Sequence, residues 1–91
     1  MNPQQAQEIL IALFRRNGCI RVVDEERRKT QGQKYRKGYE VRFVAKSQEE
    51  LATIRTALEI LGFKPGKPYQ KVRQFVQPVY GKTAVAMFTQ E

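Results

Sequence analysis

The sequence predicts an α+β fold, an αββαββ two-layer sandwich with two helices packed on one face of an antiparallel four-stranded sheet. Three observations lead to this prediction. Residues 3–16 and 48–61 repeat apolar side chains at the three- and four-residue spacing of a helix. Between them, residues 38–46 alternate apolar and polar side chains, as a strand with one buried face does. The length of 91 residues and the apolar fraction of 41% suffice for one modest core, so we expect residues 1–91 to form a single domain.

The first helix is predicted over residues 3–16. Asn2 is a favourable N-cap, and a proline at the first helical position gives up no N–H that the helix needs. Gly18 is expected to end the helix in the left-handed conformation. A strand rich in β-branched residues is expected next, over residues 19–25, with Cys19 as a small buried thiol.

The second helix is predicted to begin at a capping box formed by Ser47 and Glu50 and to end at Gly62. After a proline- and glycine-rich turn, residues 69–80 have the character of one strand. Pro78 indicates that the end of this strand lies at a sheet edge. Residues 81–90 fit either a final strand or a short C-terminal helix, because their apolar residues satisfy both spacings.

Charge is distributed unevenly along the chain. Seventeen Lys and Arg residues against nine Asp and Glu residues give a net charge of +8. Neither residues 27–39 nor residues 60–90 contain an acid. Such segregation produces a positive field over part of the surface and favours a polyanionic partner, the backbone of DNA or RNA. The alternative is a cationic surface that serves only solubility.

Two groups of residues could form a nucleic-acid site. In the segment 27–37, Tyr35 lies between two cations, a pattern that suits stacked bases beside neutralised phosphates; the alternative there is a solvated loop. On the sheet, alternation places cations outward on adjacent strands, although Glu40 is a competing ion-pair partner for Arg42. The candidate residues are Arg21, Arg27, Arg28, Lys29, Lys34, Tyr35, Arg36, Lys37, Arg42, Lys46, Lys71 and Arg73.

Catalytic and metal-binding chemistry finds little support. The chain has no histidine and one cysteine, which removes the commonest general base and any thiol pair. Residues 24–26 are consecutive acids, and neighbouring strand residues point to opposite faces, so they rarely converge on one ion. We therefore expect no catalytic residues, no metal and no cofactor. No apolar run is long enough for a membrane span and the N-terminus lacks a secretion signal, so a cytoplasmic location is expected.

Several segments resemble the LAGLIDADG homing endonucleases. Residues 10–22 (LIALFRRNGCIRV) resemble a decayed form of the family motif, and residues 39–43, 61–64 and 79–85 resemble its second strand, helix end and final junction. The resemblance implies an αββαββ half-unit whose concave sheet lies along the major groove of DNA. The alternative is that Asn17 and the glycine after it are an ordinary helix stop.

The resemblance also implies that the catalytic acid is missing. In the family, the acid just before the motif glycine binds the divalent metal for phosphodiester cleavage. Asn17 stands at that position here, and a neutral amide is a poor substitute for a carboxylate ligand. The other acidic position is Arg15, which would repel a cation. Arg16 replaces a small residue at the family's dimer contact, so we expect a monomer.

Three functional hypotheses follow. The first is a non-catalytic nucleic-acid-binding protein that uses its basic hairpin and basic sheet face on phosphates. The second is a small phage-type inhibitor, similar in kind to anti-CRISPR proteins, or an accessory subunit, which binds an assembled nucleoprotein complex of the CRISPR type and blocks its nucleic-acid recognition. The third is a residual metal-dependent endonuclease, which would need an acid where Asn17 stands.

Overall fold

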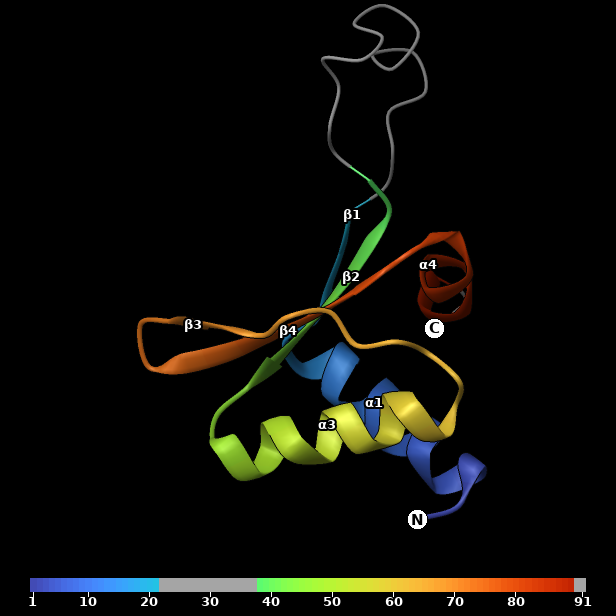
Figure 1. Ribbon diagram of the computed structural model, residues 1–91, viewed down its shortest axis with the longest axis horizontal. Helices are drawn as coiled ribbons and strands as arrows, with labels where there is room; N and C mark the ends of the chain where they lie inside the picture. The colour runs from blue at the N-terminus through green and yellow to red at the C-terminus, as the bar shows by residue number, and fades with distance from the viewer. Residues whose placement is uncertain (22–37, 90–91) are drawn as a thin grey trace, which may run out of the picture.

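The computed structural model describes residues 1–21 and 38–89. Its elements are α1 (Pro3–Asn17), β1 (Cys19–Arg21), β2 (Glu40–Ala45), α3 (Gln48–Ile60), β3 (Tyr69–Lys71), β4 (Gln74–Tyr80) and α4 (Lys82–Thr89) (Figure 1). The α+β prediction is confirmed. The C-terminal segment is a helix, which decides between the two alternatives left open by the sequence.

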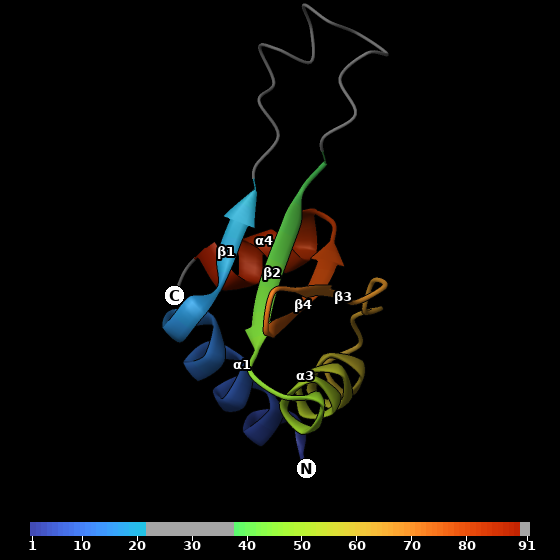
Figure 2. The same ribbon diagram turned by 90° about the vertical axis from the view of Figure 1, so that its left-hand side faces the viewer.

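The four strands within residues 1–21 and 38–89 form one antiparallel sheet in the order β1-β2-β4-β3. The buried side of β2 carries Val41, Phe43 and Ala45, and all three described helices contribute to the same core cluster as these residues. The helices therefore cover one face of the sheet and leave the other uncovered, with β1, β2 and the β3–β4 hairpin toward the viewer in Figure 2 and α4 behind them. The predicted layer of two helices thus gains a third, α4.

Three phenylalanine rings join the helices to the sheet. Phe43 on β2 lies edge-on to Phe88 on α4 with ring centroids 5.1 Å apart, and Phe14 on α1 lies 5.5 Å from Phe88 and 6.3 Å from Phe43. Phe43 and Phe88 are almost completely buried. Because such ring contacts add to the stabilisation from burial itself, this cluster fixes α4 against the end of α1.

The end of α1 differs from the prediction for Gly18. Its φ is −76°, so the left-handed expectation is wrong. Glycine is required there for a different reason: a Cβ atom would lie only 2.8 Å from both the Cα and the carbonyl oxygen of Phe14. The start of α1 is as predicted, because the side chain of Asn2 accepts a hydrogen bond from the backbone N–H of Gln5.

Helix α3 begins and ends at the predicted cap residues, but one predicted hydrogen bond at its start differs. The hydroxyl of Ser47 accepts a hydrogen bond from the N–H of Glu50, but the Glu50 carboxylate accepts from the N–H of Lys46 instead of completing the capping box. At the other end, Gly62 is left-handed with φ +86°, and the N–H of Phe63 donates to the carbonyl of Leu58. This is the hydrogen-bond pattern of a Schellman motif.

Residues 69–80 form a hairpin, so the prediction of one strand is wrong. The chain turns at Val72 and Arg73, and Lys71 pairs with Gln74. Val72 has φ +56°, a conformation that β-branched residues rarely adopt, so the sequence shows no turn signal there.

Strand β4 lies between β2 and β3, but its end pairs with β2 alone, so the edge position predicted from Pro78 is confirmed. The hydrogen bonds around Pro78 explain why a proline is accepted at this position. The Pro78 carbonyl accepts a hydrogen bond from the N–H of Gly66, on the side where pairing with β3 has ended at Val76. Since the nitrogen and carbonyl of one strand residue point to the same side, the missing N–H costs no bond to β2.

A buried polar network holds the segment that leads from α3 into β3. Gln77 is fully buried on β4, and its amide nitrogen donates to the carbonyls of Gly66 and Pro78 at 2.8 Å. Arg55 on α3 donates to the Gln77 amide oxygen at 2.7 Å and to the Gly66 carbonyl at 3.1 Å. Both ends of the glutamine amide are thereby satisfied, which fixes the start of the β3–β4 hairpin.

Candidate nucleic-acid-binding surface

The side of the sheet without helices, called the open face below, collects the residues at alternate positions of all four strands. Its rows follow from the register: Arg21, Glu40 and Tyr80; then Cys19, Arg42 and Pro78; then Val44, Val76 and Tyr69; and finally Lys71 with Gln74. The sequence prediction that Arg21 and Arg42 share the outward face of adjacent strands is therefore confirmed.

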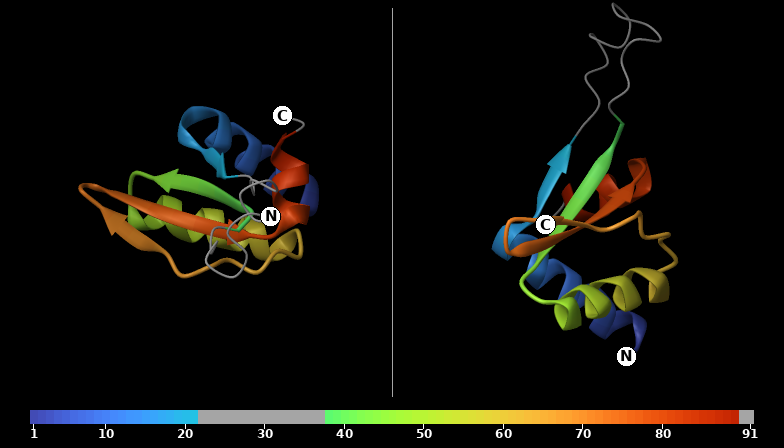
Figure 3. Two further views of the ribbon diagram at one scale, coloured as in Figure 1. Left: turned by 90° about the horizontal axis from the view of Figure 1, so that it is seen from above. Right: turned by 60° about the vertical axis from the view of Figure 1, so that its left-hand side comes forward.

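The open face is concave. The β3–β4 hairpin crosses in front of β1 and β2 in the right-hand view of Figure 3. Residues from both edges of the sheet consequently line one hollow of about 210 Å³. The residues of this central hollow are Cys19, Arg42, Val44, Tyr69, Lys71, Val72, Gln74 and Val76.

Glu40 binds two of the candidate arginines. Its carboxylate is 4% exposed, and Oε1 lies 2.8 Å from Nη2 of Arg21 and 3.1 Å from Nη2 of Arg42. Although these atoms are close, neither Oε1 of Glu40 nor Nε of Arg42 makes a well-aligned hydrogen bond within residues 1–21 and 38–89. Attraction between opposite charges at close range therefore holds the three side chains together more than aligned hydrogen bonds do. The two guanidiniums remain about one third exposed, 35% for Arg21 and 36% for Arg42. The trio thus keeps an excess positive charge that solvent can reach.

The polar contact with Glu40 raises the pKa of the Arg42 guanidinium above its usual range, and the attraction of the carboxylate charge adds to this, against the lowering effect of burial. Arg21 has a further tie, because its Nε donates to the carbonyl of Gly38 at 3.2 Å. Both arginines are therefore held in place before any ligand arrives.

The other three described candidates are exposed cations; no ion pair is found for Lys71 or Arg73 in the described part of the chain, whereas the charge of Lys46 acts on Glu50. Lys71 lies on β3 and lines the central hollow. Alternation along a single strand predicts that Arg73 shares one face with Lys71; this is wrong, because Arg73 lies in the hairpin turn. Lys46 follows the last residue of β2. The concave face therefore carries cations at its centre and at its hairpin tip.

Two tyrosines on the open face were missed by the sequence analysis. Tyr69 is 43% exposed and lines the central hollow, whereas Tyr80 is 60% exposed and lies outside it. Alternation places both tyrosines on the open face once the turn at Val72 is known, because the turn sets which residues of β3 and β4 share a face. The sequence gives no sign of that turn.

Cys19 is exposed, so the expected buried thiol is wrong. Its pairing with Arg42 places it on the open face and not among the core residues. The adjacent Ile20 occupies the inward position and packs against the core instead. Because a strand side chain points either in or out, a shift of one residue reverses the outcome.

The remaining candidates, Arg27, Arg28, Lys29, Lys34, Tyr35, Arg36 and Lys37, lie outside the described residues, as does the acidic segment 24–26. Within residues 1–21 and 38–89, no three Cys, Asp or Glu side chains are grouped so that they could hold a metal ion. In the same part of the chain, no helix is both long and apolar enough to span a membrane.

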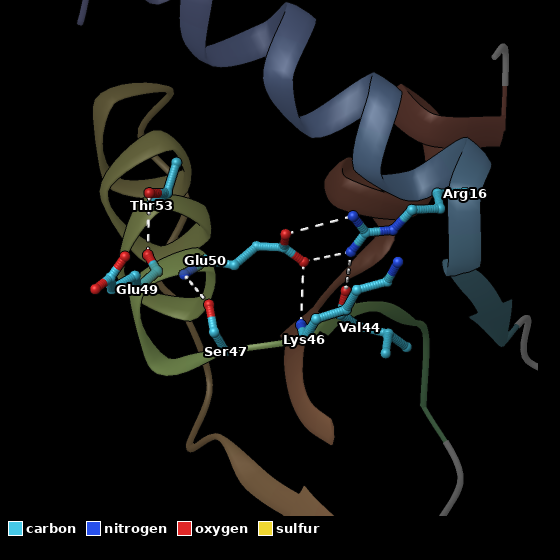
Figure 4. Close-up of polar contacts among 7 residues, drawn as sticks. All are labelled: Arg16, Val44, Lys46, Ser47, Glu49, Glu50 and Thr53. Atoms are coloured by element: carbon cyan, nitrogen blue, oxygen red, sulfur yellow. Dashed lines mark hydrogen bonds and ion pairs between the residues drawn. The ribbon is translucent and has the colours of Figure 1, made fainter. Parts of the chain in front are cut away.

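The helical layer carries charges of both signs. Apart from Glu40, the described acids lie on α1 and α3. One of them, Glu50, binds Arg16 across the two helices, and Arg16 also donates to the carbonyl of Val44 at 3.1 Å (Figure 4). In the single chain, Arg16 is thus a paired side chain that is 32% exposed. The acids of the helices are matched in number by helical cations (Arg15, Arg16, Arg55 and Lys82), so the helical layer is close to neutral while the open face keeps an excess of positive charge.

Comparisons of the chain with models of protein families, with curated proteins and with solved structures found no match. The resemblance to LAGLIDADG endonucleases accordingly stays a prediction.

Proposed function

We propose that this protein is a non-catalytic nucleic-acid-binding protein whose open face contacts the phosphate backbone. The observation that carries the proposal is the concave, cationic sheet face that the helices leave uncovered. Among the described residues of the strands, Glu40 is the only acid on this face, and it is enclosed by two arginines. Lys71 and Arg73 are exposed and have no acidic partner there. Phosphates would complement this charge pattern.

The proposal includes no catalytic step. Asn17, which replaces the acid of the LAGLIDADG motif, is the last residue of α1. An αββαββ order followed by a C-terminal helix is compatible with descent from such a half-unit. Under that descent we expect binding without cleavage, so incubation with duplex DNA and Mg²⁺ should leave the DNA intact. Mg²⁺-dependent cleavage that is lost in Asn17→Ala would establish the endonuclease alternative instead.

The test is a pair of titrations, at low and at physiological salt. One uses naked duplex DNA, single-stranded DNA and RNA. The other uses assembled nucleoprotein complexes from cytoplasmic extracts, because we propose that the protein acts in the cytoplasm. Salt-sensitive binding to a naked nucleic acid supports the proposal, because displaced counterions make phosphate contacts weaker as salt rises. Weak binding to every naked nucleic acid beside stable capture of one assembled complex would replace it with the inhibitor or accessory-subunit hypothesis.

A further inference from the structure

The central hollow has the size of one small planar group. Its volume of about 210 Å³ lies below the roughly 300–1,000 Å³ of pockets for drug-sized ligands. It is built from all four strands and the hairpin turn, so the sheet itself forms its floor and the β3–β4 hairpin forms one side. A planar group that enters the hollow would therefore contact the sheet with one face and the β3–β4 hairpin with one edge.

The lining of the hollow combines apolar, aromatic and cationic groups. Val76 is 5% exposed although it lies outside the main core cluster, so it is buried within the open face and provides, with Val44, an apolar floor. Tyr69 offers a ring that is 43% exposed. Lys71 and Arg42 supply positive charge at the same place. A nucleotide within a strand has all of these properties, since its base is planar and aromatic and its sugar carries a phosphate on each side.

We propose that the central hollow takes one unstacked base of a single-stranded nucleic acid, with Tyr69 as its stacking surface and Arg42 and Lys71 on the adjoining phosphates. This inference rests on the proposed function and narrows it to single strands. In a duplex both faces of each base are covered by its neighbours and only the edges are available in the grooves. A hollow with an aromatic wall therefore suits a base that has left its stack, in DNA or in RNA.

The hairpin tip provides an independent observation at the same place. Val72 lines the hollow, is 86% exposed and has φ +56°. Glycine or asparagine would adopt this conformation at lower cost. Strained backbone of this kind is concentrated at binding sites, where the strain is part of how a segment is positioned. The strained tip shapes the rim of the hollow.

The first part of the test compares oligomers of about 12 nucleotides with abasic oligomers of the same length, which keep the phosphates but lack the bases. The probes are oligo-dT, oligo-U and a blunt duplex. Tyr69→Leu should weaken binding of the base-bearing single strands about tenfold, the loss of one base–aromatic contact, and leave binding of the abasic oligomer unchanged. Tyr69→Phe, which keeps the ring, should bind as the wild type does.

The second part uses Cys19, which is the single cysteine of the chain, is exposed and lines the hollow. Alkylation of this thiol by iodoacetamide should slow in proportion to the bound fraction of oligo-dT or oligo-U, but not with the abasic oligomer. Three results would overturn the proposal that a base enters the hollow while leaving phosphate binding in place. They are an alkylation rate of Cys19 that binding does not slow, a wild-type affinity of Tyr69→Leu for the single strands, and an affinity for the blunt duplex equal to that for the single strands. Absence of binding to any of these probes at low salt would overturn the proposed function itself.

Discussion

Nη2 of Arg21 on β1 lies 2.8 Å from Oε1 of Glu40, its direct register partner on β2. The same oxygen lies 3.1 Å from Nη2 of Arg42, two residues further along β2. One buried carboxylate thereby holds two like charges next to each other on an exposed sheet face. Like charges on neighbouring strand positions destabilise a sheet unless an opposite charge separates them, so Glu40 permits a density of cations that the sheet would otherwise not keep.

Glu40→Gln should lower the free energy of unfolding and raise nucleic-acid affinity. Loss of the carboxylate leaves two arginines without their counter-charge, at a cost of about 1–2 kcal/mol, below that of a fully buried pair because both guanidiniums are partly exposed. The same loss frees them for phosphates. Urea denaturation and anisotropy titration measure the two effects. Glu59→Gln, the same charge change on the exposed side of α3, should alter neither; a Glu40→Gln protein with wild-type stability would contradict the bridging role.

Stability should fall in acid partly through Glu50. The hydrogen bond from Arg16 lowers the pKa of the Glu50 carboxyl below its usual value near 4.5, assisted by the N–H of Lys46 and opposed by burial. A carboxyl whose pKa is lower in the folded state stabilises the fold above the unfolded-state pKa, and this contribution is lost as the pH falls from about 4.5 through the lower folded value. Because the two side chains are 32% and 24% exposed, we expect about 0.5–1 kcal/mol.

Glu50→Gln and Arg16→Gln should each remove that part of the pH dependence. The measurement is the urea midpoint of the wild type and both variants between pH 7 and about pH 3. The expected curves converge at low pH, where the wild-type carboxyl is protonated. Variants whose stability runs parallel to the wild type over the whole range would show that the Arg16–Glu50 contact contributes nothing.

Gly18→Ala should destabilise the fold although the backbone there is not left-handed. The added Cβ would lie 2.8 Å from the Cα and the carbonyl oxygen of Phe14, backbone atoms that cannot move aside cheaply. Forced overpacking of this kind costs about 1–3 kcal/mol. Gly38→Ala is the matched control, because its Cβ would meet no atom within 4 Å. Thermal unfolding compares the two, and equal melting temperatures would refute the steric explanation.

Val72→Asn should raise stability by about 1 kcal/mol. Asparagine adopts the left-handed conformation more readily than a β-branched residue, so the substitution relieves strain at φ +56°. Val72→Ala removes the branched side chain without supplying a residue suited to that conformation, and should gain less. The free energies of unfolding from urea curves decide this; a destabilised Val72→Asn would mean that the valine side chain contributes more than the strain costs.

The sequence was a good guide where side-chain pattern alone decides the structure. The apolar spacing and the caps at Asn2 and Ser47 predict α1 and α3, because helix ends depend on local hydrogen bonds. It was a poor guide at the β3–β4 hairpin, where the turn places a valine in a conformation usual for glycine and so carries no compositional signal. Without that turn, the positions of Tyr69 and Tyr80 on one face could not be derived.

The candidate site could likewise be predicted only in part from the sequence. The outward positions of Arg21 and Arg42 follow from strand alternation, and Glu40 was predicted as an ion-pair partner of Arg42. That one carboxylate would be buried between both arginines depends on the β1–β2 register, which the sequence does not encode locally. The concavity that joins Cys19 and Val72 in one hollow depends on the curl of the whole sheet.

The most direct test of the central claim, that the open face binds phosphates, is the salt dependence of nucleic-acid binding in two variants of equal charge. Lys71→Ala with Arg73→Ala removes two cations from the hairpin, whereas Gln7→Glu with Thr56→Glu lowers the net charge equally on exposed positions of α1 and α3. The account predicts that the slope of log K against log salt falls by about two for the hairpin variant and hardly changes for the helical one. Equal slopes for both variants would contradict it, because binding would then respond to net charge and not to the open face.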